Sequence, residues 1–387
     1  MKILLTIHEA FLPDSGSAGS TFRLGEAYRR LGHDVTFFSL DDMPKLQRQA
    51  KRFVFPEFVA ARVASLQGRG AIDVVDSAPG DNWLCGLTQQ LSCRFPQQRQ
   101  RPAIITRSHG LQHLEHLWSL EEARQGRLHL SWFYSLYRGG YLLWEVANSL
   151  RYADRAFFLN QKEADYACAH LQVRPERIRI FPNGIPEGFV GLPLSPLPPP
   201  DAPVRIAQIG TYIQRKGIEY SVPALKTILK HYPQVELSFV GTGFSELDAP
   251  EELVYQDFEP AFHHRIKVIP RYAHDALPAL LQGHQITVFP SLSEGFGKAL
   301  VEAMACGLAP ITTDADGPME IVQPNHDAIV VPRRDSAALQ TAIEALLTSR
   351  ERLATLRQNA YSTAQRYSWE AIAKARLAEY ESVLQCR

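Results

Sequence analysis

The stretch Phe289-Pro-Ser-Leu-Ser-Glu-Gly-Phe-Gly-Lys-Ala-Leu-Val-Glu-Ala-Met-Ala-Cys-Gly307 contains the end of a strand, a loop and the start of a helix. The loop carries Gly295 and Gly297, and the run from Lys298 to Cys306 is rich in helix-forming residues and is closed by a glycine. Glycines let a ligand approach the backbone, and the first amides of a helix attract anions. We therefore expect an anion site here, with the charge of Lys298 adding to its field.

The same alternation of short β-rich runs and helix-like segments continues along the whole chain, as in parallel sheets with helices on both faces. Strands are predicted at Ile3–Ile7, Val35–Ser39, Ile72–Val75, Ala103–Thr106, Ala156–Leu159, Val204–Ile209, Glu236–Val240, Ile266–Ile269, Ile286–Phe289, Pro310–Thr313 and Ile329–Val331. Because 387 residues fit two or three domains, we predict an α/β protein with two doubly wound, Rossmann-like sheets. Two such domains in tandem imply a cleft between them, which suits a reaction with two substrates.

A proline-rich stretch, Leu192-Pro-Leu-Ser-Pro-Leu-Pro-Pro-Pro-Asp201, separates the two sets of strands. It cannot extend a helix or a central strand and is typical of a stiff spacer. We expect an N-terminal domain over residues 1–195, a C-terminal domain over 196–365, and a last helix over 366–387 that can cross back to the first domain.

The balance of charged residues and the spacing of the cysteines limit which partners and which cellular compartment are expected. Lysine plus arginine equals aspartate plus glutamate at 41 each, so no global field attracts nucleic acid. The five cysteines form no C-x-x-C pair, which favours buried, inert thiols in a reducing compartment. The start of the chain is a strand and no leader is recognised, and residues 128–150 carry too many polar groups to span a bilayer. A cytoplasmic protein is expected.

Two carboxylates flank the predicted anion site. Glu294 precedes the helix and Glu302 lies about one turn beyond its start. Carboxylates repel phosphate but accept hydrogen bonds from sugar hydroxyls, and a nucleotide sugar has hydroxyls on both sides of its diphosphate. Spacing alone leaves an equal alternative, in which Glu302 is a surface helix residue and Glu294 a capping residue.

Cations that could balance a diphosphate follow the first strand of the second half, in Ile209-Gly-Thr-Tyr-Ile-Gln-Arg-Lys-Gly217. Arg215 and Lys216 stand at a helix start, where the dipole disfavours positive charge, so a functional reading is favoured over a solvated basic pair. Gly241 and Gly243 end the next strand and offer another close-approach turn, which alone is a weak signal.

Taken together, these motifs resemble the signature of the retaining GT-B glycosyltransferases of family 4. The resemblance rests on Glu294 and Glu302 within their glycine-rich stretch, and it covers nearly the whole chain. Four further pieces fall in that family's order: Phe181-Pro-Asn-Gly-Ile185, Arg215-Lys-Gly217, Gly241-Thr-Gly243 and Gly317-Pro-Met-Glu-Ile321.

The resemblance implies a role for each donor-side residue. Glu294 would bind hydroxyls of the donor sugar, Glu302 the ribose hydroxyls, and Lys216 a phosphate. The backbone of Gly295, Phe296 and Gly297 would meet the distal phosphate and the sugar. The family's arginine after the glycine at Gly210 is replaced here by Thr211, and Arg215 is the candidate to substitute for it.

In the first half, the loop Pro13-Asp-Ser-Gly-Ser-Ala-Gly-Ser20 follows the first strand, a favoured ligand position. In the family a glycine-rich loop here lies near donor phosphate and acceptor; the usual glycine pair is Ser15-Gly16 in this chain, so the match at Gly16 is partial. His109, in a His-Gly step at the end of another strand, matches the family's histidine beside the reacting sugar.

Two sequence patterns could indicate a metal site, and neither is favoured. His113 and His116 share a helical face, with His109 close by, which suggests zinc, but no third ligand of clear spacing follows and no H-E-x-x-H motif is present. Asp314-Ala-Asp316 spells the D-x-D of metal-dependent sugar transferases, yet the resemblance implies no metal and no resident cofactor.

An aromatic run, Trp132, Phe133, Tyr134, Tyr137, Tyr141 and Trp144, has two interpretations. Packing in a domain core is favoured, because aromatic stripes at helical spacing normally face a core. The alternative is peripheral contact with the inner face of a membrane, or with a lipid-linked acceptor.

We therefore predict a retaining glycosyltransferase of the hexosyltransferase type, which uses a nucleotide-diphosphate sugar and a saccharide, lipid-linked or small-molecule acceptor in glycan, polysaccharide or glycolipid synthesis. A nucleotide-sugar epimerase of the same fold, and a non-catalytic subunit of a polysaccharide assembly complex, remain alternatives. A dinucleotide oxidoreductase is least favoured, since no G-x-G-x-x-G follows a strand and opens a helix.

Overall fold

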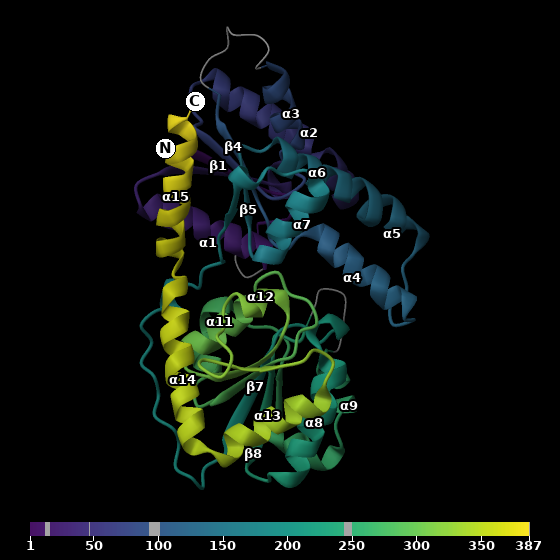
Figure 1. Ribbon diagram of the computed structural model, residues 1–387, viewed down its shortest axis with the longest axis vertical. Coiled ribbons are helices and arrows are strands. Elements are labelled where there is room, and N and C mark those ends of the chain that lie inside the picture. Colours follow the sequence, from purple (N-terminus) through teal and green to yellow (C-terminus); the bar gives the residue numbers. More distant parts are fainter. Residues whose placement is uncertain (12–15, 46, 93–100, 244–249, 387) are drawn as a thin grey trace. The chain divides into compact units, whose positions relative to one another are not determined.

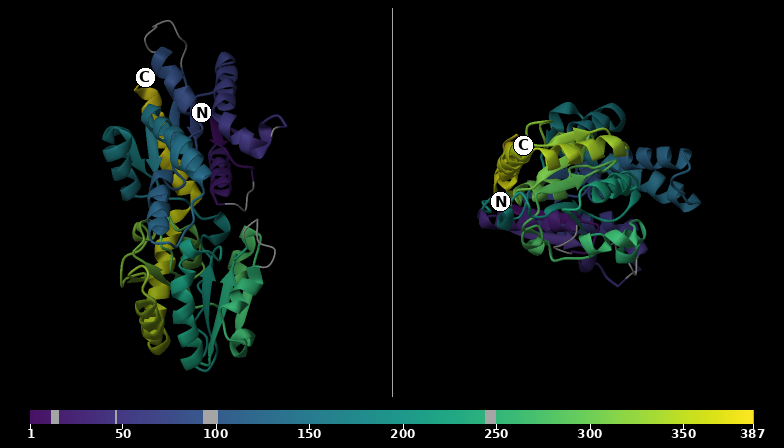
Figure 2. Two further views of the ribbon diagram at one scale, coloured as in Figure 1. Left: turned by 90° about the vertical axis from the view of Figure 1, so that its right-hand side faces the viewer. Right: turned by 90° about the horizontal axis from the view of Figure 1, so that it is seen from below.

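The computed structural model describes residues 1–11, 16–45, 47–92, 101–243 and 250–386. These residues form two compact units, the first made of Met1–Gly184 with Trp369–Arg387 and the second of Ile185–Ser368 (Figure 1). Each unit holds one six-stranded sheet with helices on both of its faces (Figures 1 and 2). The prediction of two doubly wound α/β sheets is confirmed.

The strands of the first sheet pair in parallel, in the order β2-β1-β3-β4-β5-β6. They are β1 (Lys2–Ile7), β2 (Asp34–Ser39), β3 (Val74–Ser77), β4 (Ala103–Arg107), β5 (Arg155–Phe158) and β6 (Ile178–Ile180). The order reverses between β1 and β3, because the chain runs from β1 to one side and later returns to the other. The three-residue edge strand β6 was missed, since its Ile-Arg-Ile run is too short to stand out from the sequence around it.

Helices cover the first sheet and complete its core. They are α1 (Ser17–Arg30), α2 (Arg48–Gly68), α3 (Trp83–Ser92), α4 (Gln112–Arg124), α5 (Trp132–Leu136), α6 (Leu142–Tyr152), α7 (Gln161–Leu171) and α15 (Trp369–Gln385). α1 and α15 lie side by side, and Trp369, Leu377 and Tyr380 of α15 pack with strand residues on one face. α2 packs on the opposite face.

The second sheet is also entirely parallel, in the order β12-β11-β10-β7-β8-β9, and its order reverses between β7 and β10. Its strands are β7 (Val204–Ile209), β8 (Val235–Val240), β9 (Ile266–Ile269), β10 (Ile286–Phe289), β11 (Ala309–Thr313) and β12 (Ile329–Val331). The helices are α8 (Ile218–His231), α9 (Pro250–Gln256), α10 (Leu277–Leu280), α11 (Lys298–Ala305), α12 (Asp316–Met319), α13 (Ser336–Thr348) and α14 (Arg350–Ala364). The helix expected from Lys298 and the two C-terminal helices are present.

The proline-rich stretch belongs to the second unit and is not a free spacer. Arg357 of α14 donates to the carbonyl oxygens of Gly307 at 2.6 Å and Ser195 at 2.9 Å. Arg350 donates to the carbonyl oxygen of Leu197 at 3.2 Å. These contacts hold the stretch against α14, so the division between the units falls earlier, after Gly184, and the whole of α15 lies in the first unit.

The aromatic run does not pack in a core along its whole length, so the favoured interpretation is wrong for several of its residues. Trp132 is 76% exposed, Phe133 47% and Trp144 50%. No residue of α5 is buried. The expectation of buried thiols also fails at Cys386, which is exposed. No helix within the described ranges has the length together with the hydropathy that a membrane crossing needs.

Candidate functional site

Two loops meet where the second sheet reverses its order. One follows β7 and ends at Gly217, and the other follows β10. Gly217 has φ +72°, and a Cβ there would lie 1.9 Å from the carbonyl oxygen of Pro290. The amide of Leu292 donates to the carbonyl oxygen of Arg215 at 2.9 Å. Only glycine allows this close contact, which brings the two loops together at the carboxyl ends of their strands.

The contact between the loops places a lysine and a glutamate together. The Lys216 ammonium pairs with the Glu294 carboxylate, and Ser291 donates to the same oxygen at 3.1 Å. Burial raises the pKa of Glu294, but the charges of Lys216 and Arg215 outweigh it and hold that pKa below its usual value. Glu294 is therefore ionised. The N-cap of α11 is Gly297 and no side chain caps this helix, so the capping alternative is wrong.

Gly210 and Arg215 support this arrangement from the β7 loop. Gly210 has φ +129°, a conformation that favours glycine, and the Lys216 stem lies across it, 3.6 Å from the position a Cβ would take. Arg215 donates from Nη1 to the carbonyl oxygen of Ser293 at 3.2 Å, beside Glu294. Arg215 thus reaches the loop that the resemblance assigns to the donor.

Glu302 is buried in α11, at 1% exposure, so its alternative as a surface residue is wrong. Its Oε1 lies 2.8 Å from Nε2 of His274 and 3.9 Å from Nζ of Lys298. His274 lies in a short turn after β9, and its ring stacks on Phe189 at 5.7 Å between centroids. Sequence reasoning missed His274, because no motif marks it and only the fold brings it to Glu302.

The start of α11 is built for close approach to its backbone. Gly297 precedes the helix with φ +101°, and no side chain caps the helix there. The Phe296 side chain is buried and packs near Tyr367, so this residue offers only its backbone at the loop. Gly317 backs the loop, because its amide donates to the Glu294 carbonyl oxygen at 3.1 Å and a Cβ there would lie 2.7 Å from that atom.

The glycines after β8 use their amides in the sheet. The amide of Gly241 donates to the Ile269 carbonyl oxygen at 2.7 Å, and that of Gly243 donates to Pro270 at 2.9 Å. Gly241 has φ +77°, and a Cβ there would lie 3.0 Å from the Tyr272 ring. These glycines thus permit close packing beside the β7 loop, while their amides are already engaged within the protein.

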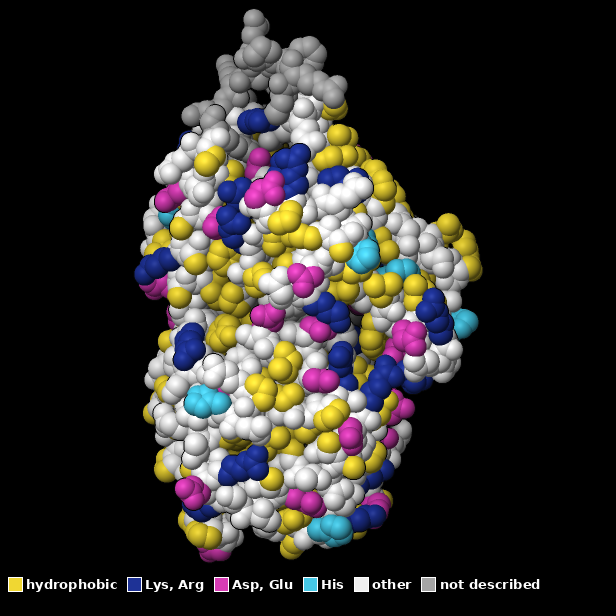
Figure 3. Space-filling model, viewed as in Figure 1, with side chains coloured by type: hydrophobic (Ala, Val, Ile, Leu, Met, Phe, Trp, Pro, Cys, Tyr) yellow, Lys and Arg dark blue, Asp and Glu magenta, His cyan; other side chains and the backbone are white. Residues whose placement is uncertain are grey.

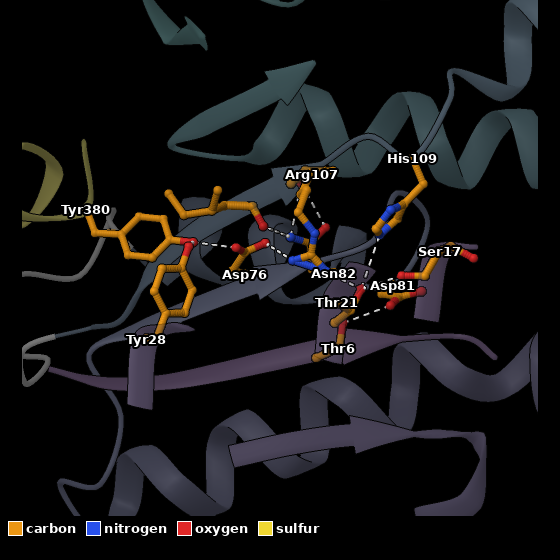
Figure 4. Close-up of polar contacts among 12 residues, drawn as sticks. Thr6, Ser17, Thr21, Tyr28, Asp76, Asp81, Asn82, Arg107, His109 and Tyr380 are labelled. Carbon is orange, nitrogen blue, oxygen red and sulfur yellow. Dashed lines mark hydrogen bonds and ion pairs between the residues drawn. The ribbon is translucent and has the colours of Figure 1, made fainter. Parts of the chain in front are cut away.

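In the first unit, the predicted histidine lies in a largely buried polar network (Figure 4). His109 follows β4, and its Nε2 lies 3.4 Å from the Thr21 hydroxyl. Burial first, and then the charge of Arg107, lower the pKa of His109 well below its ordinary value. The imidazole is therefore neutral at physiological pH and can hydrogen-bond a hydroxyl without carrying charge.

Gly16 is the N-cap of α1, and its carbonyl oxygen accepts from the Ser20 amide at 3.2 Å. Among the residues that the structure describes, a Cβ at Gly16 would meet nothing within 4 Å. Of the glycine-rich loop, residues 13–15 lie outside the described residues, and residues 17–20 form the first turn of α1.

Sequence reasoning missed a second polar pair in this unit. His8 directly follows β1, and its Nδ1 lies 2.6 Å from Oδ1 of Asp81, which comes after β3. Thr6 donates to the other Asp81 oxygen at 2.8 Å. Although burial opposes it, Asp81 raises the pKa of His8, so the pair favours an imidazolium with a carboxylate. The pair lies at the reversal between β1 and β3, the counterpart of the Lys216 and Glu294 position.

The candidate metal ligands have other partners. The three histidines do not converge: His116 lies 3.1 Å from the Tyr134 hydroxyl, His113 packs against Tyr166, and His109 faces Thr21. Asp314 accepts from Arg333 at 2.9 and 3.0 Å. Within the described part of the chain, no three side chains of the usual metal-binding types gather at one point.

Comparison with known families matches both halves of the chain. Residues 196–363 match the model "Glycosyl transferases group 1", and residues 15–188 match "Glycosyltransferase Family 4". D-inositol 3-phosphate glycosyltransferase of Segniliparus rotundus is 24% identical over 60% of this chain and 53% of its own length. The gpi3 subunit of phosphatidylinositol N-acetylglucosaminyltransferase of Schizosaccharomyces pombe is 27% identical over 54% and 45%. The chain thus spans about half the length of these relatives.

Solved structures share the fold over the whole chain. Sucrose-phosphate synthase of Thermosynechococcus elongatus has a TM-score of 0.76 at 22% identity, with 100% of both chains covered. HepE of Anabaena in complex with UDP has a TM-score of 0.71 at 17% identity, with 99% of this chain and 100% of that chain covered. At these identities the likeness establishes the GT-B fold.

Proposed function

Because the chain belongs to the group 1 glycosyltransferases and has their GT-B fold, we propose that it transfers a sugar from a nucleotide-diphosphate donor to a hydroxyl acceptor, with retention of configuration at the transferred sugar. The ion pair of Lys216 and Glu294, beside the start of α11, carries this proposal. It joins the cation that a diphosphate needs to a carboxylate that can accept from sugar hydroxyls.

The donor half of the proposal rests on charge. The diphosphate lies against the first amides of α11, and Lys216 and Arg215 balance its negative charge. Lys216 then turns from Glu294 to phosphate, which frees Glu294 for the sugar hydroxyls. Glu302 accepts from the ribose, and His274 holds its carboxylate in place.

The transfer itself needs positioning and charge stabilisation more than a strong base. The acceptor oxygen bonds to the anomeric carbon on the face from which the diphosphate leaves, and a leaving-group oxygen takes the hydroxyl proton. This chemistry assigns stabilisation of the departing charge to Lys216, Arg215 and the helix start, with no resident metal or cofactor.

In this proposal, side chains of the first unit bind the acceptor substrate. Neutral His109 hydrogen-bonds a sugar hydroxyl, and His8, whose Nδ1 faces Asp81, donates from Nε2 to an acceptor oxygen. A saccharide, a small polyol or a lipid-linked sugar provides such oxygens. With a lipid-linked acceptor, the proposed enzyme acts in the cytoplasm and contacts the inner face of a membrane peripherally. Nucleic acid is not among the proposed partners.

Thermal-shift screening of UDP, GDP, ADP and their sugars tests the donor class, because a ligand of the native state raises the melting temperature. A rise of the melting temperature with one nucleoside diphosphate, and with its sugar, is expected. If none of them shifts the transition, the donor proposal fails. The anomeric configuration of the product, read by NMR, tests retention. Isomerised donor without transfer would indicate an epimerase, and binding without turnover a non-catalytic subunit.

A further inference from the structure

An exposed aromatic surface on the first unit has no role in the transfer described above. It consists of Trp132, Phe133 and Leu136 of α5, which are 76%, 47% and 61% exposed. In Figure 1, α4 and α5 stand away from the strands of the first sheet, and in Figure 3 hydrophobic side chains gather at that edge. Taking roughly 200 Å² for a large side chain, the three expose on the order of 400 Å² of apolar surface, within the range that is often functional on a monomer.

The inner side of the same segment is firmly held. Residues Tyr137–Tyr141 form a π-helical turn that continues α5 into α6. A Cβ at Gly139 would lie 2.8 Å from the His116 ring of α4, and the Tyr137 ring lies 4.5 Å from that of Phe53 in α2. The inward aromatics thus fix the segment, and α5 presents its outward side chains on a rigid support.

Charge favours one kind of partner for this surface. No aspartate or glutamate occurs between Glu122 and Glu145, whereas Arg124, Arg127 and Arg138 do. Arg124 pairs with Glu121 at 3.7 Å and Arg127 with Glu122 at 2.7 Å. Arg138 is exposed, and the positions one helical turn from it hold Tyr, Ser or Leu. The segment from residue 128 to 144 is rich in tryptophan and tyrosine and holds no aspartate or glutamate, and Arg138 is its one arginine; this composition complements the headgroup region of an anionic bilayer.

The exposed area is small for a stable protein partner. A stable complex buries about 800 Å² on each partner, roughly twice what these side chains offer. An interfacial helix needs only a few apolar side chains in the headgroup region, helped by basic groups.

We propose that Trp132, Phe133 and Leu136 form the surface through which this protein binds anionic membranes. The inference deepens the membrane contact of the proposed function and gives it a location. A lipid-linked acceptor would then be reached from a protein held at the bilayer by α5. Binding to lipid requires no sugar donor, so it can be tested apart from catalysis.

The test is cosedimentation of the full chain with phosphatidylcholine vesicles that contain or lack about 30% phosphatidylglycerol. The variant Trp132→Ser/Phe133→Ser/Leu136→Ser should lower the partition coefficient on the mixed vesicles by about tenfold or more, because each side chain loses its burial in lipid. The fold of the variant is checked by circular dichroism. Leu91→Ser is the matched control, an exposed leucine on α3 at 52% exposure, and should bind like the wild type.

Arg138→Gln should weaken binding to the mixed vesicles at low salt and not at high salt. Three outcomes overturn the proposal: no binding by the wild type, equal binding to vesicles with and without phosphatidylglycerol, or binding that the triple variant leaves unchanged. Light scattering completes the test, since a dimer that the triple variant abolishes, without vesicle binding, would assign the surface to a second copy instead.

Discussion

Replacing Lys216 by alanine should lower kcat on the donor by on the order of 100-fold. The substitution removes the cation that faces the diphosphate, and loss of one such stabilising group costs about 3 kcal/mol in other enzymes. It also removes the ion-pair partner of Glu294, whose side chain is only 11% exposed. The remaining charge of Arg215 keeps the loss from growing far beyond this figure.

The assay is release of nucleoside diphosphate from the sugar donor that gives the largest thermal shift. Lys230→Ala is the matched control, because Lys230 forms an exposed pair with Glu259 at 2.8 Å in the same unit. It should keep its activity, as exposed pairs contribute little. The pH profile supplies a second readout: without Lys216, burial raises the pKa of Glu294, so the variant's profile should shift to higher pH. A Lys216→Ala protein that keeps more than about a third of the wild-type kcat refutes the reasoning.

Three further predictions follow from single contacts. Gly217→Ala should lower the melting temperature of the second unit by several degrees, because its Cβ would lie 1.9 Å from the Pro290 carbonyl oxygen; calorimetry measures it. His274→Ala should raise KM for the donor by about tenfold with little change in kcat, since Glu302 loses the partner that orients it; steady-state kinetics measures both. Burial raises the pKa of Glu145 from 4.5 to about 8, so its stabilising contribution is present below pH 4.5 and is lost as pH rises through about 8. Glu145→Gln should therefore gain melting temperature relative to wild type between these pH values.

The first two of these variants have controls in the same unit. Gly188→Ala meets nothing within 4 Å and should leave the melting temperature unchanged. His284→Ala removes another buried histidine, which bonds Ser238 at 2.9 Å, and should not raise KM selectively. A pH-independent difference between Glu145→Gln and wild type would contradict the burial argument.

The sequence predicted what depends on local chemistry. Strand ends followed by glycines located both loops of the second unit, and the disfavoured cations at a helix start pointed to Lys216. It could not show that Lys216 pairs with Glu294, because that contact joins loops 78 residues apart. His274 was beyond reach for the same reason. The aromatic run was misjudged because helical spacing shows which residues share a face, not whether anything covers it.

The His8–Asp81 pair lies where ligands are expected in a doubly wound sheet, at the point where the strand order reverses. In both sheets the strand order reverses beside the first strand, between β1 and β3 and again between β7 and β10. Loops leave such a point in opposite directions, so side chains just after those two strands are free to converge on a ligand. In the second unit this position holds Lys216 and Glu294, and in the first it holds His8 and Asp81. Polar residues in the loops after the first and third strands of the first half, and after the first and fourth strands of the second, were therefore the signal.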